Sequence, residues 1–112
     1  MYNPTFSIIG RTMLHVVPLF YNTLDEKQVA AAFREIYPKA LAACADAGYG
    51  LYRTHVHFMD DVMDTYSYND HVMRRFLETI KDAVDKNGIL SPGKSGIWPR
   101  PLREERSIDG LR

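Results

Sequence analysis

Hydrophobic and polar positions first follow a strand pattern along this chain and then a helical one. Two runs rich in β-branched and aromatic residues, 5–10 and 12–21, predict two strands. The second run is mostly apolar at both alternating sets of positions, so we expect strands that are covered on both sides. Pro18 cannot donate to a strand ladder and therefore predicts an edge position or a bulge.

A long amphipathic helix is predicted next. Asn22 or Thr23 can cap it, and apolar residues then recur every three or four positions. This face consists of Val29, Phe33, Ile36, Ala40, Leu41 and Cys44. Pro38 removes one backbone donor and predicts a kink or two abutting helices, and Gly48 is expected to end the element.

The second half of the chain predicts two further helices and an irregular end. After a short extended piece at 51–54, a brief helix is expected over 56–65, and a longer one from Asn69 or Asp70 to Asn87-Gly88. The apolar face of the longer helix consists of Val72, Met73, Phe76, Ile80 and Val84. Residues 91–112 lack periodicity and predict an ordered loop followed by a fraying tail. The order of elements indicates an α+β fold.

Composition narrows the class of protein. The 112 residues are 46% hydrophobic, which suffices for one small globular domain. Fourteen basic residues balance fourteen acidic ones, which argues against nucleic acid or an anionic membrane as a partner. The single cysteine, Cys44, is expected to be a small buried residue and indicates a reducing compartment. No apolar run approaches the roughly 20 residues of a membrane helix, so a cytoplasmic location is expected.

One segment satisfies the phosphate-loop pattern letter for letter. It runs from Gly88 to Ser95 as Gly-Ile-Leu-Ser-Pro-Gly-Lys-Ser. Such a loop binds phosphate only between a strand and a helix, whereas here a helix is predicted before it and Gly96 and Pro99 follow it. We therefore do not expect a nucleotide triphosphate site.

Other polar clusters have simpler structural interpretations. His55 and His57 could bind a metal with Asp60 and Asp61, but a helix starting near residue 56 would make the two imidazoles diverge, so no metal site is expected. The acidic residues, Asp64 included, predict a solvated helix face. Three methionines at helical spacing are expected to fill the core, namely Met59, Met63 and Met73.

Tyr52-Arg53 is the most informative pair, because it puts a phenol donor beside a permanent cation after a glycine-rich turn. That pairing suits an oxyanion or an electron-rich ring. The alternative is an arginine that only pairs with a carboxylate at a domain boundary. His15 lies among apolar residues and is either a hydrogen-bonded core histidine or a residue that lines a pocket.

Four motifs in order resemble the C-terminal part of the vanillyl-alcohol oxidase/4-cresol dehydrogenase family of FAD-linked oxidases. They are Tyr52-Arg53-Thr54-His55, Phe58-Met59-Asp60, Thr65-Tyr66-Ser67-Tyr68-Asn69 and the segment 88–99. The resemblance runs from about Thr5 to Pro99. It implies an α+β C-terminal fragment of a two-domain enzyme, in which residues 1–49 end the antiparallel-sheet cap domain and residues 50–112 return to the FAD-binding domain.

The same resemblance implies an activity, which is oxidation of the benzylic carbon of a para-substituted phenol by hydride transfer to FAD. By similarity, Tyr52 and Arg53 are catalytic and bind the phenolate, and Arg53 also binds the flavin. Thr5, His15 and Val16 fall where the family lines its substrate cavity. Leu14 and Leu51 depart from the family, since a polar residue and an acidic residue can stand at these places in relatives.

The resemblance further implies that most of the FAD site lies outside this chain, so the chain alone is expected to be inactive. A missing N-terminal half, a cytochrome electron acceptor and a homo-oligomer are the expected partners besides the phenol. Two rival hypotheses stay open. One is a stand-alone, non-catalytic binding module, and the other is the tail of an FAD-linked hydroxy-acid oxidase, which segment 89–94 also resembles.

Overall fold

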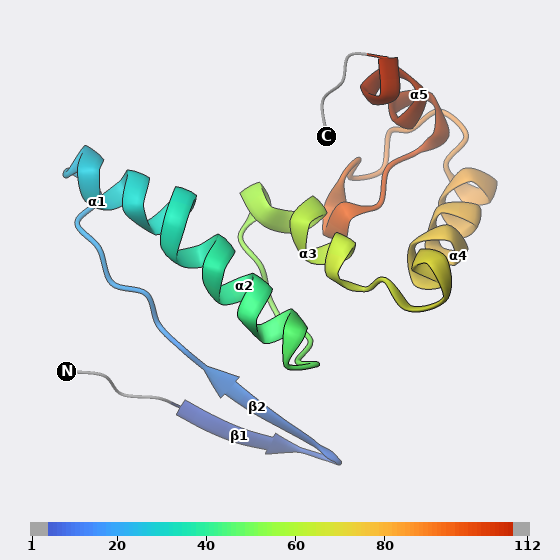
Figure 1. Ribbon diagram of the computed structural model, residues 1–112. Coiled ribbons are helices and arrows are strands. Elements are labelled where there is room, and N and C mark those ends of the chain that lie inside the picture. The colour runs from blue at the N-terminus through green and yellow to red at the C-terminus, as the bar shows by residue number, and fades with distance from the viewer. Residues whose placement is uncertain (1–4, 109–112) are drawn as a thin grey trace. The chain divides into compact units, whose positions relative to one another are not determined.

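The computed structural model describes residues 5–108, which form two compact units (Figure 1). The first unit ends at Tyr52 and the second begins at Arg53. This division lies three residues beyond the predicted boundary between residues 49 and 50. The elements comprise a small antiparallel sheet and several helices, as expected of an α+β fold. The assignment of the units to a cap domain and an FAD-binding domain stays a prediction.

The first unit opens with a β-hairpin of strands β1 (Thr5–Ile9) and β2 (Thr12–Val16). The strands pair in the register Thr5 to Val16 and Ile9 to Thr12, and Gly10, with φ of 61°, supplies the left-handed turn position between them. Strand β2 ends before Pro18, because proline has no N–H for the ladder. The expectation of strands covered on both sides is wrong for this chain, since large apolar side chains of both strands are exposed. These are Phe6, Ile8, Ile9, Met13 and Val16.

A continuous helical stretch follows as α1 (Glu26–Ala31), a π-helical segment (Ala32–Ile36) and α2 (Tyr37–Asp46). The predicted caps are wrong, because the Asp25 carboxylate accepts from the amides of Lys27 and Gln28 at 3.0 and 3.3 Å. Pro38 lies in the first turn of α2, where its missing N–H is tolerated best. The predicted disturbance at Pro38 therefore takes the form of a widened turn, in which the Tyr37 amide bonds the carbonyl of Ala32.

Helix α2 ends just before Gly48, as the sequence predicts. Gly48 has φ of 79°, its amide bonds the carbonyl of Ala45 at 2.9 Å, and the amide of Tyr49 bonds that of Cys44 at 2.8 Å. This pair of bonds is the Schellman motif, which satisfies carbonyls at a helix end. Cys44 itself is exposed, so the expectation of a buried cysteine is wrong.

The core of the second unit lies around α3 (Met59–Thr65), which follows a 3-10 turn at Val56–Phe58. The buried apolar residues here are Phe58, Met59, Val62 and Met63. A second 3-10 turn, Lys94–Gly96, packs on α3 so closely that a Cβ on Gly96 would stand 2.6 Å from that of Met63. The predictions of a brief helix at this point and of Met59 and Met63 as core residues are confirmed.

Helix α4 (Tyr68–Val84) begins with three left-handed residues, Asn69, Asp70 and His71, with φ of 47°, 53° and 53°. Asparagine and aspartate tolerate this region better than most residues, so the predicted helix start coincides with an irregular first turn. Much of the predicted apolar face is exposed, so the prediction of Met73 as a core residue is wrong. The exposed members are Met73, Phe76, Ile80 and Val84.

The prediction of an irregular tail is wrong as far as residue 108, because helix α5 runs over Arg100–Ile108, and the last four residues of the predicted tail lie outside the described residues. Pro101 fits the first turn of a helix, and Arg100 pairs with Glu104 four residues later at 3.0 Å. An ion pair between Arg103 and Asp82 connects α5 to α4. The sequence pattern did not predict this helix, because its residues lack apolar periodicity. Among the residues that the structure describes, no helix is long and apolar enough to cross a bilayer.

Candidate active-site segment

Tyr52 and Arg53 lie where the chain passes from one unit to the other. Tyr52 closes the first unit with 63% of its surface exposed, and Arg53, also exposed, opens the second. Neither residue belongs to a helix or strand. A loop of this kind, carried by defined elements on both sides, is a common place for residues that bind ligands.

Residues that follow Arg53 are held by local hydrogen bonds. The His55 imidazole accepts from the His57 amide at 3.2 Å, and the His55 carbonyl accepts from the Phe58 amide at 3.0 Å and from the Thr54 hydroxyl at 3.3 Å. The ring of buried Phe58 meets that of His57 edge-on, with centroids 5.0 Å apart. His55 therefore caps a turn, and no group of three potential metal ligands occurs within residues 5–108.

The three predicted substrate-lining residues lie on the β-hairpin. Thr5 and Val16 are partners in the ladder, and His15 pairs with Phe6. Because neighbouring strand positions alternate, His15 and Val16 project to opposite faces. His15 stacks on Phe6 with ring centroids 4.3 Å apart and is exposed, so the alternative of a core histidine is wrong. His15 and Val16 are therefore available on different faces of the hairpin.

In the segment with the phosphate-loop pattern, backbone amides bind the carboxylate of Asp85. Asp85, 6% exposed, accepts from the amides of Ile89 and Leu90 at 2.9 and 3.0 Å and pairs with Lys81 at 2.7 Å. Lys81 also donates to the Leu90 carbonyl. Bonding to Lys81 and to these amides lowers the pKa of Asp85, so the carboxylate stays charged. The segment lies between α4 and a 3-10 turn, and two amides that a phosphate would need already have an anion.

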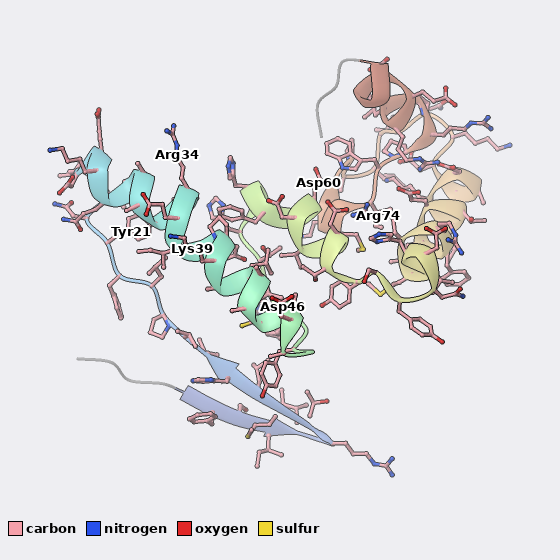
Figure 2. All side chains as sticks on the ribbon, in the orientation of Figure 1. Tyr21, Arg34, Lys39, Asp46, Asp60 and Arg74 are labelled. Atoms are coloured by element: carbon pink, nitrogen blue, oxygen red, sulfur yellow. The ribbon has the colours of Figure 1, made fainter. Side chains whose placement is uncertain are left out.

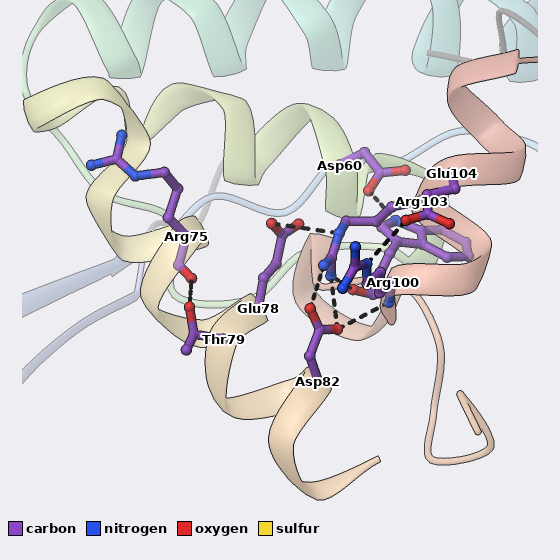
Figure 3. A network of polar contacts seen from close by, with 9 residues as sticks. Asp60, Arg75, Glu78, Thr79, Asp82, Arg100, Arg103 and Glu104 are labelled. Carbon is purple, nitrogen blue, oxygen red and sulfur yellow. Dashed lines mark hydrogen bonds and ion pairs between the residues drawn. The ribbon is translucent and has the colours of Figure 1, made fainter. Parts of the chain in front are cut away.

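A polar network connects α3, α4 and α5 within the second unit (Figure 3). The indole of Trp98 donates to the Asp60 carboxylate at 2.7 Å, and the Trp98 carbonyl accepts from Arg103. The guanidinium of Arg103 binds Asp82 at 2.5 and 3.3 Å and lies 3.8 Å from Glu78. The predicted solvated acidic face is therefore wrong for Asp60, which anchors an indole.

The two carboxyls that face Arg103 have opposite pKa shifts. The hydrogen bond from Arg103 lowers the pKa of Asp82. Burial raises the pKa of Glu78, although the positive charge of Arg103 opposes that shift. Arg103 therefore binds Asp82 as its main anionic partner.

Arg74 joins the start of α4 to α3. It pairs with Asp64 at 2.7 Å and donates to the Asp60 carbonyl at 3.5 Å. Arg74 and Asp60 are labelled among the side chains in Figure 2. Asp64 is still mostly exposed, so the prediction of a solvated face holds better for it than for Asp60. Arg75 on the next position binds the carboxylate of Asp70 instead.

Sequence reasoning missed the network because its members are far apart in the chain. Trp98 is 38 residues from Asp60, and Arg103 is 21 residues from Asp82. The one usable signal was Trp98 itself, since an indole N–H that is partly buried needs an acceptor. Asp85 had a local signal, because Lys81 precedes it by four residues on a predicted helix.

Comparisons with known proteins bear on the identity of this chain. Residues 5–95 match the family described as FAD linked oxidases, C-terminal domain. The chain is 36% identical over 99 residues to the 4-cresol dehydrogenase (hydroxylating) flavoprotein subunit of Pseudomonas putida, a match covering 86% of this chain and 18% of that protein. It also matches the structure of 4-ethylphenol oxidase from Gulosibacter chungangensis in complex with isoeugenol, at 45% identity and a TM-score of 0.84.

That structural match covers 92% of this chain and 20% of the oxidase, so the chain spans about a fifth of the length of these relatives. The α+β fold is the fold of the matched domain. A family match over most of the chain and two relatives above 30% identity lead to one conclusion. The chain belongs to the family of the C-terminal domain of FAD linked oxidases.

Proposed function

We propose that this chain forms the C-terminal part of a flavin-dependent oxidoreductase that oxidises the benzylic carbon of para-substituted phenols. The observation that carries the proposal is that both relatives are named for such phenols, 4-cresol and 4-ethylphenol. The exposed Tyr52-Arg53 pair at the boundary of the two units supplies suitable groups. No comparable observation supports a hydroxy-acid oxidase.

Tyr52 and Arg53 have distinct tasks in this proposal. A free phenol has a pKa of about 10, and a cation with a phenolic donor within hydrogen-bond reach lowers it, because both stabilise the phenolate. Tyr52 donates its O–H to the phenolate oxygen. Arg53 stabilises the negative charge, and in a water-excluded site such stabilisation contributes a few kcal/mol, on the order of 2.7–4 for one donor. Lysine is a poorer substitute, since it lacks the planar guanidinium fork.

The chemistry that bound FAD would supply is that of a hydride acceptor for the benzylic carbon. The donor set of this chain fits one part of such a cofactor, because Arg53 is an exposed, permanent cation that can also stabilise negative charge on a reduced ring. The loop over 88–95 is not its phosphate site, since Asp85 already occupies the amides of Ile89 and Leu90. Residues 1–49 then belong to the substrate domain and residues 50–112 to the FAD-binding domain.

The hairpin contributes to the substrate side. Val16 and His15 project to opposite faces, so at most one face of the hairpin lines the cavity near any one substrate atom. Val16, whose ladder partner is Thr5, belongs to one candidate lining and His15 with Phe6 to the other. A cytoplasmic location remains part of the proposal.

The test is a chimera in which this chain replaces the matching segment of 4-ethylphenol oxidase. The chimera is expected to bind FAD and oxidise 4-ethylphenol, and Arg53→Ala should lower turnover by about 10²–10³-fold. Arg53→Lys should recover only part of this loss. Arg100→Ala is the matched control, because the Arg100 side chain is 74% exposed and its ion-pair partner is the similarly exposed Glu104 on the same helix.

Unchanged turnover in Arg53→Ala would refute the role of the pair. The chain alone provides an independent measurement, namely its visible spectrum after addition of FAD and then of 4-ethylphenol. We expect no perturbed flavin spectrum from the chain by itself. A perturbed spectrum would show that these 112 residues bind the cofactor without the rest of an enzyme.

A further inference from the structure

The segment that carries Arg53 is followed by α3, which is connected to a distant part of the second unit by a side-chain hydrogen bond. Asp60 lies seven residues after Arg53, at the start of α3, and its carboxylate accepts from the Trp98 indole at 2.7 Å. Both residues are part-buried, so water competes less for this bond than at an exposed site. The bond joins segments 38 residues apart.

The indole is itself held from two sides. Its ring packs against Gly93, where an added Cβ would stand 2.5 Å from the ring carbon Cζ2. The Trp98 carbonyl accepts from Arg103, which is fixed by Asp82 on α4. Pro99, directly after the indole, is fully buried. Trp98 is therefore a fixed point to which the start of α3 is tied.

From Asp60 back to Arg53 the chain has little freedom. Met59 is buried and its sulfur accepts from the Ser95 amide at 3.3 Å, and Phe58 is buried in the 3-10 turn. The turn is capped by His55, two residues after Arg53, through the amides of His57 and Phe58. A shift of α3 against Trp98 would thus be passed to the Arg53 backbone through a short, hydrogen-bonded segment.

The geometry points to Asp60 and Trp98 as positioning residues for Arg53, a role that rests on the proposed function of Arg53 as the phenolate-binding cation. Trp98 fixes Asp60, Asp60 fixes the start of α3, and α3 fixes the turn that follows Arg53. Neither residue needs to touch the substrate. A displacement of about 1 Å at a catalytic group can cost as much as 10²-fold in rate, so such a support has a measurable effect.

The test uses the chimera with 4-ethylphenol oxidase and three substitutions. Trp98→Phe removes the N–H donor together with the outer ring carbons that face Gly93, Asp60→Leu removes the acceptor alone, and Asp60→Asn keeps an oxygen that can accept the same bond. The first two should lower the rate of 4-ethylphenol oxidation about ten- to a hundredfold. Asp60→Asn should restore most of the rate, and Arg100→Ala serves as the unaffected control.

A pH profile of binding separates positioning from a loss of stability. While Arg53 is in place, the bound phenol has a pKa below its ordinary value of about 10. In Trp98→Phe that pKa should move back toward 10, whereas a variant that only unfolds more easily keeps the profile and binds fewer equivalents. An unchanged profile in Trp98→Phe overturns the inference. If Arg53→Ala also leaves binding unchanged, it is the proposed function that fails.

A second measurement uses the full 112-residue chain and needs no cofactor. Hydrogen exchange at the amides of His57 and Phe58 reports whether the turn after Arg53 is fixed, because both amides are bonded to His55. Trp98→Phe should speed their exchange, and Asp60→Asn should not. Equal exchange in Trp98→Phe and the unsubstituted chain would overturn the inference even if the chimera cannot be produced.

Discussion

Replacing Arg103 by alanine should destabilise the second unit more than any other single surface change on α5. Its guanidinium holds Asp82 with one bond of 2.5 Å and one of 3.3 Å, lies 3.8 Å from Glu78 and donates to the Trp98 carbonyl. Helix α5 has no long apolar face to replace these contacts. Alanine would leave Asp82, Glu78 and the carbonyl without this donor.

The magnitude follows from the exposure of the partners. Hydrogen bonds to charged groups contribute about 1.5–3 kcal/mol each when protected, whereas exposed ion pairs contribute about 0–1 kcal/mol. The side chains of Arg103 and Asp82 are 27% and 30% exposed, which places this group between the two limits. We therefore expect Arg103→Ala to lower the free energy of unfolding by about 2–3 kcal/mol in total. Arg100→Ala, whose pair is 74% and 64% exposed, should cost at most about 0.5 kcal/mol.

Urea unfolding followed by fluorescence measures this difference well, because Trp98 is the single tryptophan and lies in the network. With a slope near the low end of about 1–3 kcal/mol/M for small proteins, the midpoint should fall by about 2 M in Arg103→Ala and hardly move in Arg100→Ala. Arg103→Lys should be intermediate, since it keeps the charge and loses the two-point geometry. Equal midpoints for the two alanine variants would refute the reasoning.

Two further predictions concern stability at low pH and the replacement of two glycines by alanine. Bonding to Arg103 and to Lys81 lowers the pKa values of Asp82 and Asp85, so below their ordinary value of 3.8 the unfolded chain binds more protons than the folded one. The stability that these two carboxylates contribute is therefore complete above about pH 4 and is lost as the pH falls further. Between about pH 6 and pH 2.5 the urea midpoint should fall less in Asp85→Asn than in the unsubstituted chain. Glu78, whose pKa is raised by burial, acts in the opposite direction above its ordinary value of 4.5. Gly93→Ala should cost more than Gly48→Ala, although both have φ near 78°, because the added methyl group meets Trp98 at 2.5 Å in one case and nothing within 4 Å in the other. Equal unfolding midpoints, or an unshifted Trp98 emission in Gly93→Ala, would contradict that contact.

Local rules predicted the elements that are specified by neighbouring residues. Glycine at position 48 ends α2 because only a left-handed residue completes the Schellman bonds. Pro38 marks the disturbed turn because its ring removes a donor at a fixed place. Phe58, Met59 and Met63 lie in the core, as their spacing indicates.

The errors have a different origin, which is contacts between distant residues. Helix α5 has no apolar stripe, and its link to α4 depends on Arg103 and Asp82, which no short window contains. The cap of α1 is a local exception, because Asp25 suits either a first-turn or a cap position and in the structure its carboxylate caps the helix. Of the candidate site, the Tyr52-Arg53 pair was visible as a motif, whereas the Asp60–Trp98 bond behind it was visible only in three dimensions.

The division of the chain at Tyr52 and Arg53 has a mechanical consequence. Consecutive α-carbons are about 3.8 Å apart across a trans peptide, whatever the orientation of the bodies on either side. One peptide bond therefore fixes the distance between the α-carbons of the phenol donor, Tyr52, and the cation, Arg53. Engineers who recombine such enzymes should place junctions elsewhere, so that Tyr52 and Arg53 come from the same parent.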